Sequence, residues 1–345
     1  MTEKELIIKS LLFEETERIP VTILTGVTWT IKRNHLSPIG MLRLPDAGAK
    51  LMVDSMEEIG SDIVFGGRVS PYVIIRAMGG IVDSSKVGLP TSIIHCPLKE
   101  VSDVRDMDIE EVTKRILADE EYQLMVTQTR NMRQLLGQRK FIAVGGFAPF
   151  TMASQMVGVT KFLEAIFDED ENIPKLLSFA TEVVYRFTEG FVKAGGDMIY
   201  IADPVASGDL ISPDMYQETA LPPLKEMVSR FKPICDYFLF HICGNTMKRV
   251  VPVSKSGVGC FSVDSIDVKE AMKLAEGRIA IMGNLNPANV LETKKPEEIY
   301  AMSLDLCKNA GLHGGFWLGP GCDLAPDTPL ENLKAMVKAA HDVHK

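Results

Sequence analysis

Short apolar runs recur along the chain, and most of them end in Gly, Asp, Asn or a residue type that binds metals. The runs cover residues 19–24, 62–65, 141–144, 198–201, 237–240, 260–263, 278–282 and 315–318. From the third run onward, nearly every pair is separated by a stretch with helical periodicity. Near-continuous apolar runs that alternate with helices predict parallel strands buried on both faces of a sheet. Eight such runs predict an α/β fold, specifically a (β/α)8 TIM barrel.

The chain lacks the glycine pattern of the alternative parallel-sheet fold, the open doubly wound sheet. Its first run is followed by Thr25-Gly26-Val27-Thr28, which is not a G-x-G-x-x-G sequence. Residues 79–99 interrupt the barrel rhythm, because two short extended stretches there are joined through Gly88-Leu89-Pro90 and predict an antiparallel hairpin. The sequence contains no linker, repeat or low-complexity tract. We therefore expect residues 1–345 to form a single domain, with the hairpin as an insertion.

The composition, 46% hydrophobic and 24% charged residues among 345, is that of an ordinary soluble globular protein. The net charge of −9 argues against a nucleic-acid partner or an anionic membrane surface, because both would require a basic face. No apolar stretch approaches the roughly 20 residues that cross a bilayer, and the first residues lack a signal-peptide core. We therefore expect a cytoplasmic protein. In that compartment its six cysteines do not suggest a disulfide framework.

A candidate metal motif, His241-Ile242-Cys243, follows directly on the apolar run 237–240. Two residues in this spacing at a strand's end can reach one ion, and Cys322, 79 positions further along at another strand's end, can supply a third ligand. One imidazole and two thiolates form a zinc set, and three protein ligands leave a tetrahedral position open, as in catalytic sites. On the motif alone, the alternative stays open that these are buried strand residues and a small loop thiol.

The other polar residues at strand ends extend this candidate site, because barrel enzymes place their chemistry at the carboxyl ends of the strands. His241, Cys243 and Cys322 all follow strands on that face, which favours the zinc interpretation. We expect Asp203 either to bind substrate or to orient the zinc histidine. The remaining candidate substrate-binding residues are Ser207, Asp264 and Asn284. For the last two, the alternative is that they satisfy backbone groups at strand ends.

The sequence resembles the uroporphyrinogen decarboxylase superfamily, and within it the methylcobamide:coenzyme M methyltransferases. The resemblance covers nearly the whole chain and is carried by Arg18-Ile19-Pro20, the 79–99 hairpin, the 203–213 loop, His241-Ile242-Cys243-Gly244-Asn245 and Asn284-Leu285-Asn286-Pro287. The H-x-C…C zinc signature of these methyltransferases matches His241, Cys243 and Cys322. The decarboxylase branch lacks this zinc site and carries an arginine-rich motif near its amino end. Residues 25–30 occupy that region here without arginine, which disfavours porphyrin decarboxylation.

The resemblance implies a zinc-dependent enzyme that moves a methyl group between a corrinoid and a thiol such as coenzyme M. The corrinoid would be carried by a separate small protein, because the chain has no D-x-H-x-x-G cobalamin motif. One alternative is a corrinoid-protein methyltransferase of a bacterial demethylation system, which uses tetrahydrofolate or a methoxylated or methylamine-type substrate. Another is a zinc- or corrinoid-binding module without activity. This is disfavoured because an open catalytic-type zinc site is a poor storage design.

Overall fold

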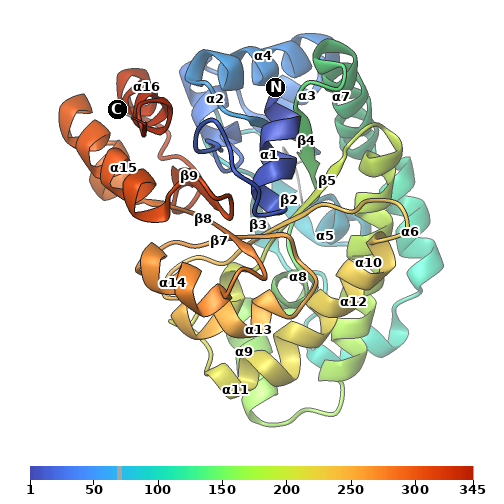
Figure 1. Ribbon diagram of the computed structural model, residues 1–345. Coiled ribbons are helices and arrows are strands. Elements are labelled where there is room, and N and C mark those ends of the chain that lie inside the picture. Colours follow the sequence, from blue (N-terminus) through green and yellow to red (C-terminus); the bar gives the residue numbers. More distant parts are fainter. Residues whose placement is uncertain (68–71, 345) are drawn as a thin grey trace.

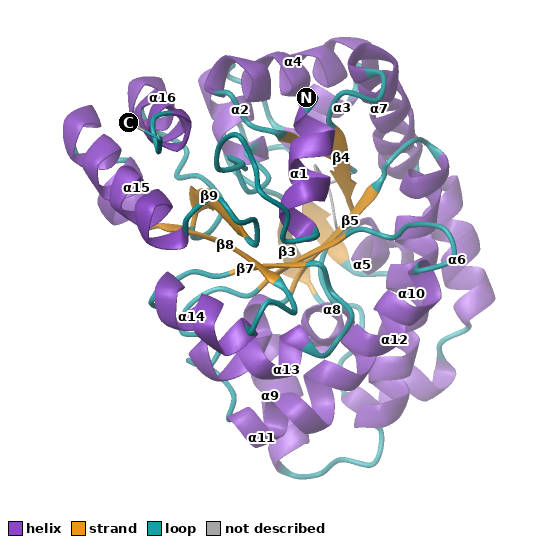
Figure 2. Cartoon of the chain, in the orientation of Figure 1, coloured by secondary structure: helices purple, strands orange, loops and turns teal. Residues whose placement is uncertain are grey.

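The computed structural model describes residues 1–67 and 72–344, and it shows a curled parallel sheet surrounded by helices (Figures 1 and 2). Seven strands follow one another in the order β1-β4-β5-β6-β7-β8-β9. Their bounds are Ile63–Gly66 (β1), Phe141–Val144 (β4), Met198–Ala202 (β5), Phe238–His241 (β6), Cys260–Ser262 (β7), Ala280–Leu285 (β8) and Phe316–Pro320 (β9). All six pairings are parallel. The predicted α/β barrel class is confirmed.

The first apolar run, residues 19–24, closes the sheet without forming a full strand. On one side Val21 makes a single parallel bridge to Leu318 of β9. On the other side the Asp62 amide donates to the Val21 carbonyl at 2.8 Å. The expected eighth strand is therefore reduced to a bridge. The Val21 and Ile23 amides donate to the Asp62 carboxylate and the Ser61 hydroxyl, so side-chain acceptors replace the backbone carbonyls of a regular ladder.

Helices follow most strands and form the outer layer (Figure 2). They are α1 Glu3–Leu11, α2 Val27–Arg33, α3 Pro38–Leu42, α4 Pro45–Ile59, α5 Val73–Ala77, α6 Ile109–Ala118, α7 Glu120–Leu136, α8 Pro149–Val157, α9 Val159–Phe167, α10 Ile173–Lys193, α11 Pro213–Met215, α12 Leu221–Phe231, α13 Val250–Ser254, α14 Val268–Ala275, α15 Pro296–Ala310 and α16 Leu330–His341. Within the described ranges, none of these helices has the length and apolar content needed to cross a membrane.

The strands place alternate residues on opposite sides of the sheet, and this alternation separates two apolar clusters. Tyr200 of β5 belongs to the cluster that fills the barrel interior, whereas its neighbour Ile199 belongs to the cluster beneath the outer helices. Helix α1 closes the amino end, where Ile7 joins the interior cluster and Ser10 Oγ accepts a hydrogen bond from Trp317 Nε1 at 3.1 Å. The packed interior leaves the carboxyl ends of the strands as the place for a site.

The expected hairpin outside the barrel rhythm is present. Strands β2 (Ile81–Asp83) and β3 (Ser92–His95) form a separate antiparallel pair, with an irregular register between Ile81 and Val82. The pair lies outside the seven-stranded sheet, in which β1 is the direct neighbour of β4.

Candidate metal centre

His241, the last residue of β6, points into the mouth of the barrel because it shares a side of the strand with the interior residue Leu239. Only 2% of its surface is exposed. Cys243 follows two positions later, and Cys322 lies just beyond the end of β9. The ligand atoms of these three residues all lie within 4.8 Å of one another. The structure therefore brings the three expected ligands together.

The spacing of the three atoms suits a tetrahedral zinc ion. At ordinary zinc distances, two sulfur ligands stand about 3.8 Å apart, and a sulfur and a nitrogen about 3.6 Å apart. Here Cys243 Sγ lies 3.6 Å from Cys322 Sγ and 3.2 Å from His241 Nε2. The donor set, one imidazole and two thiols, selects zinc over hard cations such as Mg²⁺. The residues present thus fit a zinc ion with one position left for a substrate atom.

The other ring nitrogen of the histidine is held by a serine. His241 Nδ1 lies 3.1 Å from Ser262 Oγ, and both atoms are buried. Ser262 is paired with His241 in the register between β6 and β7, so the two side chains leave the sheet side by side. A partner at Nδ1 fixes the ring orientation and leaves Nε2 free for a metal.

The turn that carries Cys243 is fixed by two acidic side chains. The Gly244 amide donates to Asp264 Oδ2 at 2.9 Å, and the Asn245 amide donates to Asp209 Oδ2 at 3.0 Å. Gly244 adopts φ +70°, and a Cβ there would lie 2.0 Å from Asp209 Oδ2. The turn therefore requires glycine both for its backbone conformation and for the close approach of the carboxylate. The Ser207 hydroxyl donates to the same Asp209 oxygen at 3.3 Å.

The turn that carries Cys322 is fixed in a similar way. The carboxylate of Asp323 accepts hydrogen bonds from the Gly26 amide at 3.1 Å and from the Thr25 hydroxyl. A Cβ on Gly321 would lie 2.7 Å from Asp264 Oδ1. Asp264 therefore lies between the two ligand turns, with Oδ2 hydrogen-bonded to the Cys243 turn and Oδ1 packed against Gly321 of the Cys322 turn.

The two thiols shift each other's proton affinity. A hydrogen bond from Cys243 lowers the pKa of Cys322, and His241 adds to this effect. The same contact raises the pKa of Cys243. Burial raises the pKa of Asp264, and the hydrogen bond from the Gly244 amide opposes this shift. One of the two thiols, that of Cys322, thus loses its proton readily. A dication bound at the centre would favour deprotonation of the second thiol as well.

The side chain of Asp203 does not contact the His241 ring, so of the two roles expected for it only substrate binding stays a prediction. Its Oδ1 accepts hydrogen bonds from the amide and hydroxyl of Thr151, at 2.9 and 2.6 Å, while Ser262 occupies the Nδ1 side of His241. Asp203 Oδ2 is buried and has no hydrogen-bond partner among the described residues. Burial raises the pKa of Asp203 to about 7, because the charged form loses its solvation.

The remaining candidates support the turns from beneath. The Asn284 amide donates to the Asp264 and Ile266 carbonyls, each at 2.6 Å, so it satisfies backbone groups behind the Asp264 side chain. Ser207 engages Asp209 in both directions, because the Asp209 amide donates back to Ser207 Oγ at 3.2 Å. Both residues therefore position the ligand turns.

A cavity of about 160 Å³ lies beside the Cys322 turn. It is lined by Thr25, Val27, Thr28, Ile31, Pro38, Tyr72, Pro90, Thr91, Phe147 and Asp323. Asp323 adjoins Cys322 in the chain, and Pro90 and Thr91 come from the segment between β2 and β3. The hairpin thus contributes to the wall of a small compartment next to the candidate metal centre.

Sequence reasoning missed three residues of this site, namely Ser262, Asp209 and Asp323. Ser262 carried a usable signal, because it follows the inward-facing Cys260 by two positions on β7. Asp209 and Asp323 carried none, since they act on segments 36 and 297 positions away.

Comparison with known proteins places this arrangement in a family. A model of the uroporphyrinogen decarboxylase (URO-D) family matches residues 2–343. The methylcobamide:CoM methyltransferase MtbA of Methanosarcina acetivorans is 32% identical over 237 residues, which are 68% of this chain and 67% of that protein. The methylcobamide:CoM methyltransferase MtaA of Methanosarcina barkeri is 28% identical, over 87% of this chain and 85% of its own. A solved methyltransferase from Methanosarcina mazei superposes with a TM-score of 0.86 at 25% identity, over the full length of both chains.

The chain therefore belongs to the uroporphyrinogen decarboxylase family. Within that family it falls in the MtbA- and MtaA-like methyltransferase branch, as the sequence resemblance predicted.

Proposed function

We propose that the protein is a zinc-dependent methyltransferase that moves a methyl group between a corrinoid, carried by a separate small protein, and a small-molecule thiol. One observation carries the proposal: His241, Cys243 and Cys322 converge at the barrel mouth with the spacing of tetrahedral zinc ligands. The names of the relatives, methylcobamide:CoM methyltransferases, support the choice of corrinoid and thiol.

The chain's own residues hold the centre and shape what enters it. His241, Cys243 and Cys322 would bind the zinc, and Ser262 fixes the histidine ring through Nδ1. When bound, zinc supplies Lewis acidity that keeps a thiol as its thiolate near neutral pH. Of the four candidate substrate-binding residues, we assign Asp264 to the rim of the open position, because its carboxylate contacts both ligand turns. Ser207 and Asn284 act by positioning, and Asp203 stays a candidate to bind substrate through its buried Oδ2.

The proposed transfer balances without a general base on the protein. The thiol proton leaves to solvent, the thiolate sulfur forms a bond to the methyl carbon, and the carbon–cobalt bond breaks. Its electron pair stays on the cobalt, which becomes Co(I). The cavity of about 160 Å³ beside Cys322 has room for a small thiol but not for a corrin ring. The corrinoid would therefore approach from the open mouth of the barrel.

The test is methyl transfer from methylcobalamin by the zinc-loaded protein, assayed with a panel of thiols and with tetrahydrofolate. We expect turnover with a thiol, loss of turnover after zinc removal, and one additional sulfur in the zinc X-ray absorption spectrum when the thiol is added. Turnover of a methylated donor with Co(I) corrinoid, and not of methylcobalamin with thiol, would instead show that the enzyme loads the corrinoid. Turnover of neither pair would overturn both enzymatic assignments and favour a binding module.

A further inference from the structure

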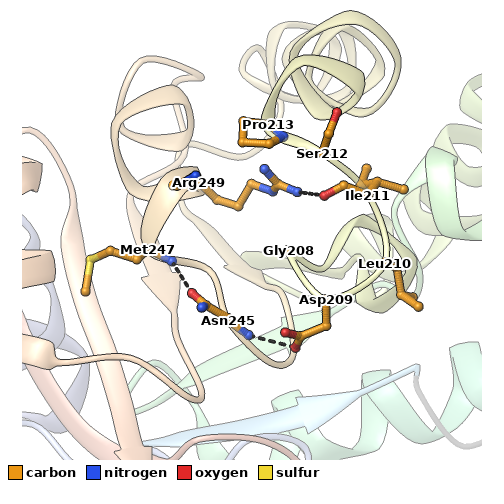
Figure 3. A pocket seen from close by; sticks show the side chains of 10 residues that line it. Gly208, Asp209, Leu210, Ile211, Ser212, Pro213, Asn245, Met247 and Arg249 are labelled. Carbon is orange, nitrogen blue, oxygen red and sulfur yellow. Dashed lines mark hydrogen bonds between the residues drawn. The ribbon is translucent and has the colours of Figure 1, made fainter.

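A second and larger cavity, of about 430 Å³, lies between the loop after β5 and the segment after β6 (Figure 3). Residues 208–213 form one wall, and Asn245, Met247, Lys248 and Arg249 form the other. The residues that line it include none of the three candidate metal ligands, although Cys243 belongs to the same segment after β6. The cavity is therefore a separate compartment on the same rim of the barrel.

The cavity contains a buried cation without an acidic partner. Arg249 is 1% exposed, and its guanidinium donates to the Ala206 carbonyl through Nε at 3.2 Å and to the Ile211 carbonyl through Nη2 at 2.6 Å. Figure 3 shows the guanidinium extending across the cavity toward Ile211, beneath Ser212 and Pro213. The aromatic ring of Tyr216 lies 4.7 Å from the guanidinium carbon. Nη1 makes no hydrogen bond within the described part of the chain.

This arrangement is unusual for a buried charge. Arg18, a partly buried arginine whose side chain is 16% exposed, forms a two-pronged ion pair with Asp62. Arg249, in contrast, forms no ion pair with any described residue, and burial lowers its pKa because two carbonyls and a ring replace only part of the lost hydration. Lys248, exposed at the rim of the same cavity, adds a second positive charge. Among the described residues that line the cavity, two cations, Lys248 and Arg249, thus face a single carboxylate, that of Asp209, and form no ion pair with it.

We propose that this cavity is a binding subsite for an oxyanion, that is, a carboxylate, sulfonate or phosphate group held by Arg249 and Lys248. A guanidinium matches the planar or tetrahedral oxygens of such groups, and a hydrogen bond to a charged group in a buried place is strong. Asp209, the acid in the cavity wall, accepts hydrogen bonds from the Asn245 amide and the Ser207 hydroxyl, whereas the guanidinium of Arg249 donates to two carbonyls and not to this carboxylate.

The subsite adjoins the candidate metal centre through one shared contact. Asp209 and Asn245 line the cavity, and their hydrogen bond fixes the turn that begins with Cys243 and Gly244. An oxyanion at Arg249 would thus lie behind this turn. Two sources supply the same chemistry: the anionic end of the methyl carrier, in which case the inference rests on the proposed function, or a free inorganic anion acting on the turn.

The test is calorimetric titration of the full chain with sodium sulfate at constant ionic strength. We expect saturable binding that weakens about tenfold or more in Arg249→Met, because one charge-assisted hydrogen bond is worth about 1.5–3 kcal/mol. Arg249→Lys keeps the charge and loses the planar fork, so it should show an intermediate loss. Lys248→Met should weaken binding about two- to fivefold, since its charge is exposed. Lys255→Met, an exposed lysine outside the cavity, is the matched control and should bind as the unaltered protein does.

A second arm separates the sources. If the oxyanion belongs to the methyl carrier, 2-mercaptoethanesulfonate should displace sulfate from the zinc-loaded protein at lower concentration than ethanesulfonate, which has the same anionic group and no thiol. If it is a free anion, the two sulfonates should displace sulfate equally well. Equal sulfate binding by the unaltered protein and Lys248→Met, a rim variant that leaves the buried core intact, together with unchanged binding in Arg249→Lys, would overturn the subsite. Because no methyl transfer enters this measurement, a failed subsite and a failed methyltransferase assignment give different results.

Discussion

Two buried aspartates, Asp62 and Asp203, lie at opposite ends of the same sheet and differ in how completely their carboxylate oxygens are hydrogen-bonded. Asp62 precedes β1 at the amino end, and both of its oxygens are paired: Oδ1 and Oδ2 each accept from Arg18, and Oδ2 also accepts from the Val21 amide. Asp203 follows β5 at the carboxyl end. Only its Oδ1 is paired, with Thr151, and Oδ2 has no hydrogen-bond partner in the described part of the chain.

This difference distinguishes the amino end of the barrel, where polar groups stabilise the fold, from the carboxyl end, where the candidate site lies. At the amino end, polar groups satisfy one another, and the result is a closed layer that joins the first segment to the sheet. At the carboxyl end, His241 and the two thiols lie within 4.8 Å of one another, and Asp203 Oδ2 has bonding capacity left over. Incomplete pairing of buried polar groups costs stability, so it is expected where a ligand completes the set.

The largest effect should follow from removing the metal ligands themselves. In a Cys243→Ala, Cys322→Ala double variant, the zinc content should fall from about one per chain to near zero, because a single histidine cannot hold the ion. Metal analysis of the purified protein measures this. Cys96→Ala, which removes an exposed cysteine away from the centre, should keep its zinc. Full zinc retention by the double variant would refute the ligand assignment.

At the other end, Asp62→Ala should cost stability without touching the centre. It leaves the Arg18 guanidinium and the Val21 amide without their partner, and breaking a buried pair typically costs about 3–5 kcal/mol. Urea unfolding measures the loss, and the native variant should still bind zinc. Glu58→Ala, which breaks a surface pair with Arg33, is the control and should cost less than about 1 kcal/mol. Zinc loss in a folded Asp62→Ala variant would contradict the separation of the two ends.

Ser262→Ala should weaken zinc binding rather than abolish it. Without Ser262 Oγ, the His241 ring loses the partner of Nδ1, and such partners are worth about 10–100-fold in metal affinity. Competition with a chelator measures the affinity. Ser303→Ala, which removes a buried hydroxyl from α15, should leave the affinity unchanged. An unchanged affinity in Ser262→Ala would show that the ring is held by packing alone.

Asp203→Asn should change how stability depends on pH. The pKa of Asp203 is about 7 in the folded protein and lies near 4 when unfolded, so the folded state keeps a proton that the unfolded chain has lost. Stability therefore falls as pH rises between these values, by at most about 1.4 kcal/mol per pH unit, and levels off above pH 7. Asparagine does not titrate, so the variant should gain relative to the unaltered protein as pH rises. Urea unfolding at pH 5 and pH 7.5 measures this, and parallel losses in both proteins would contradict it.

The barrel and the clustering of His241, Cys243 and Cys322 were predictable from the sequence because both leave local signals. Near-continuous apolar runs predicted the strands. A His and a Cys two positions apart at a strand's end predicted the candidate metal centre. The eighth strand failed because Asp62 and Ser61, which lie some 40 positions away, supply side-chain acceptors for Val21 and Ile23 in place of a backbone ladder. The hydrogen bond from the Gly26 amide to Asp323 joins segments 297 positions apart, and the periodicity of the sequence does not predict such a contact.

The placement of the ligands on β6 and just past β9 also has a consequence for the order in which the molecule is assembled. His241 and Cys243 come together as soon as β6 forms, but Cys322 reaches them only after β9 has paired with β8, whose register brings Asn284 opposite Gly319. A nascent chain that stops short of β9 offers a metal two ligands instead of three. Zinc binding by all three residues would then require that the barrel is complete. Once bound, the ion would stabilise the folded state against detachment of β9.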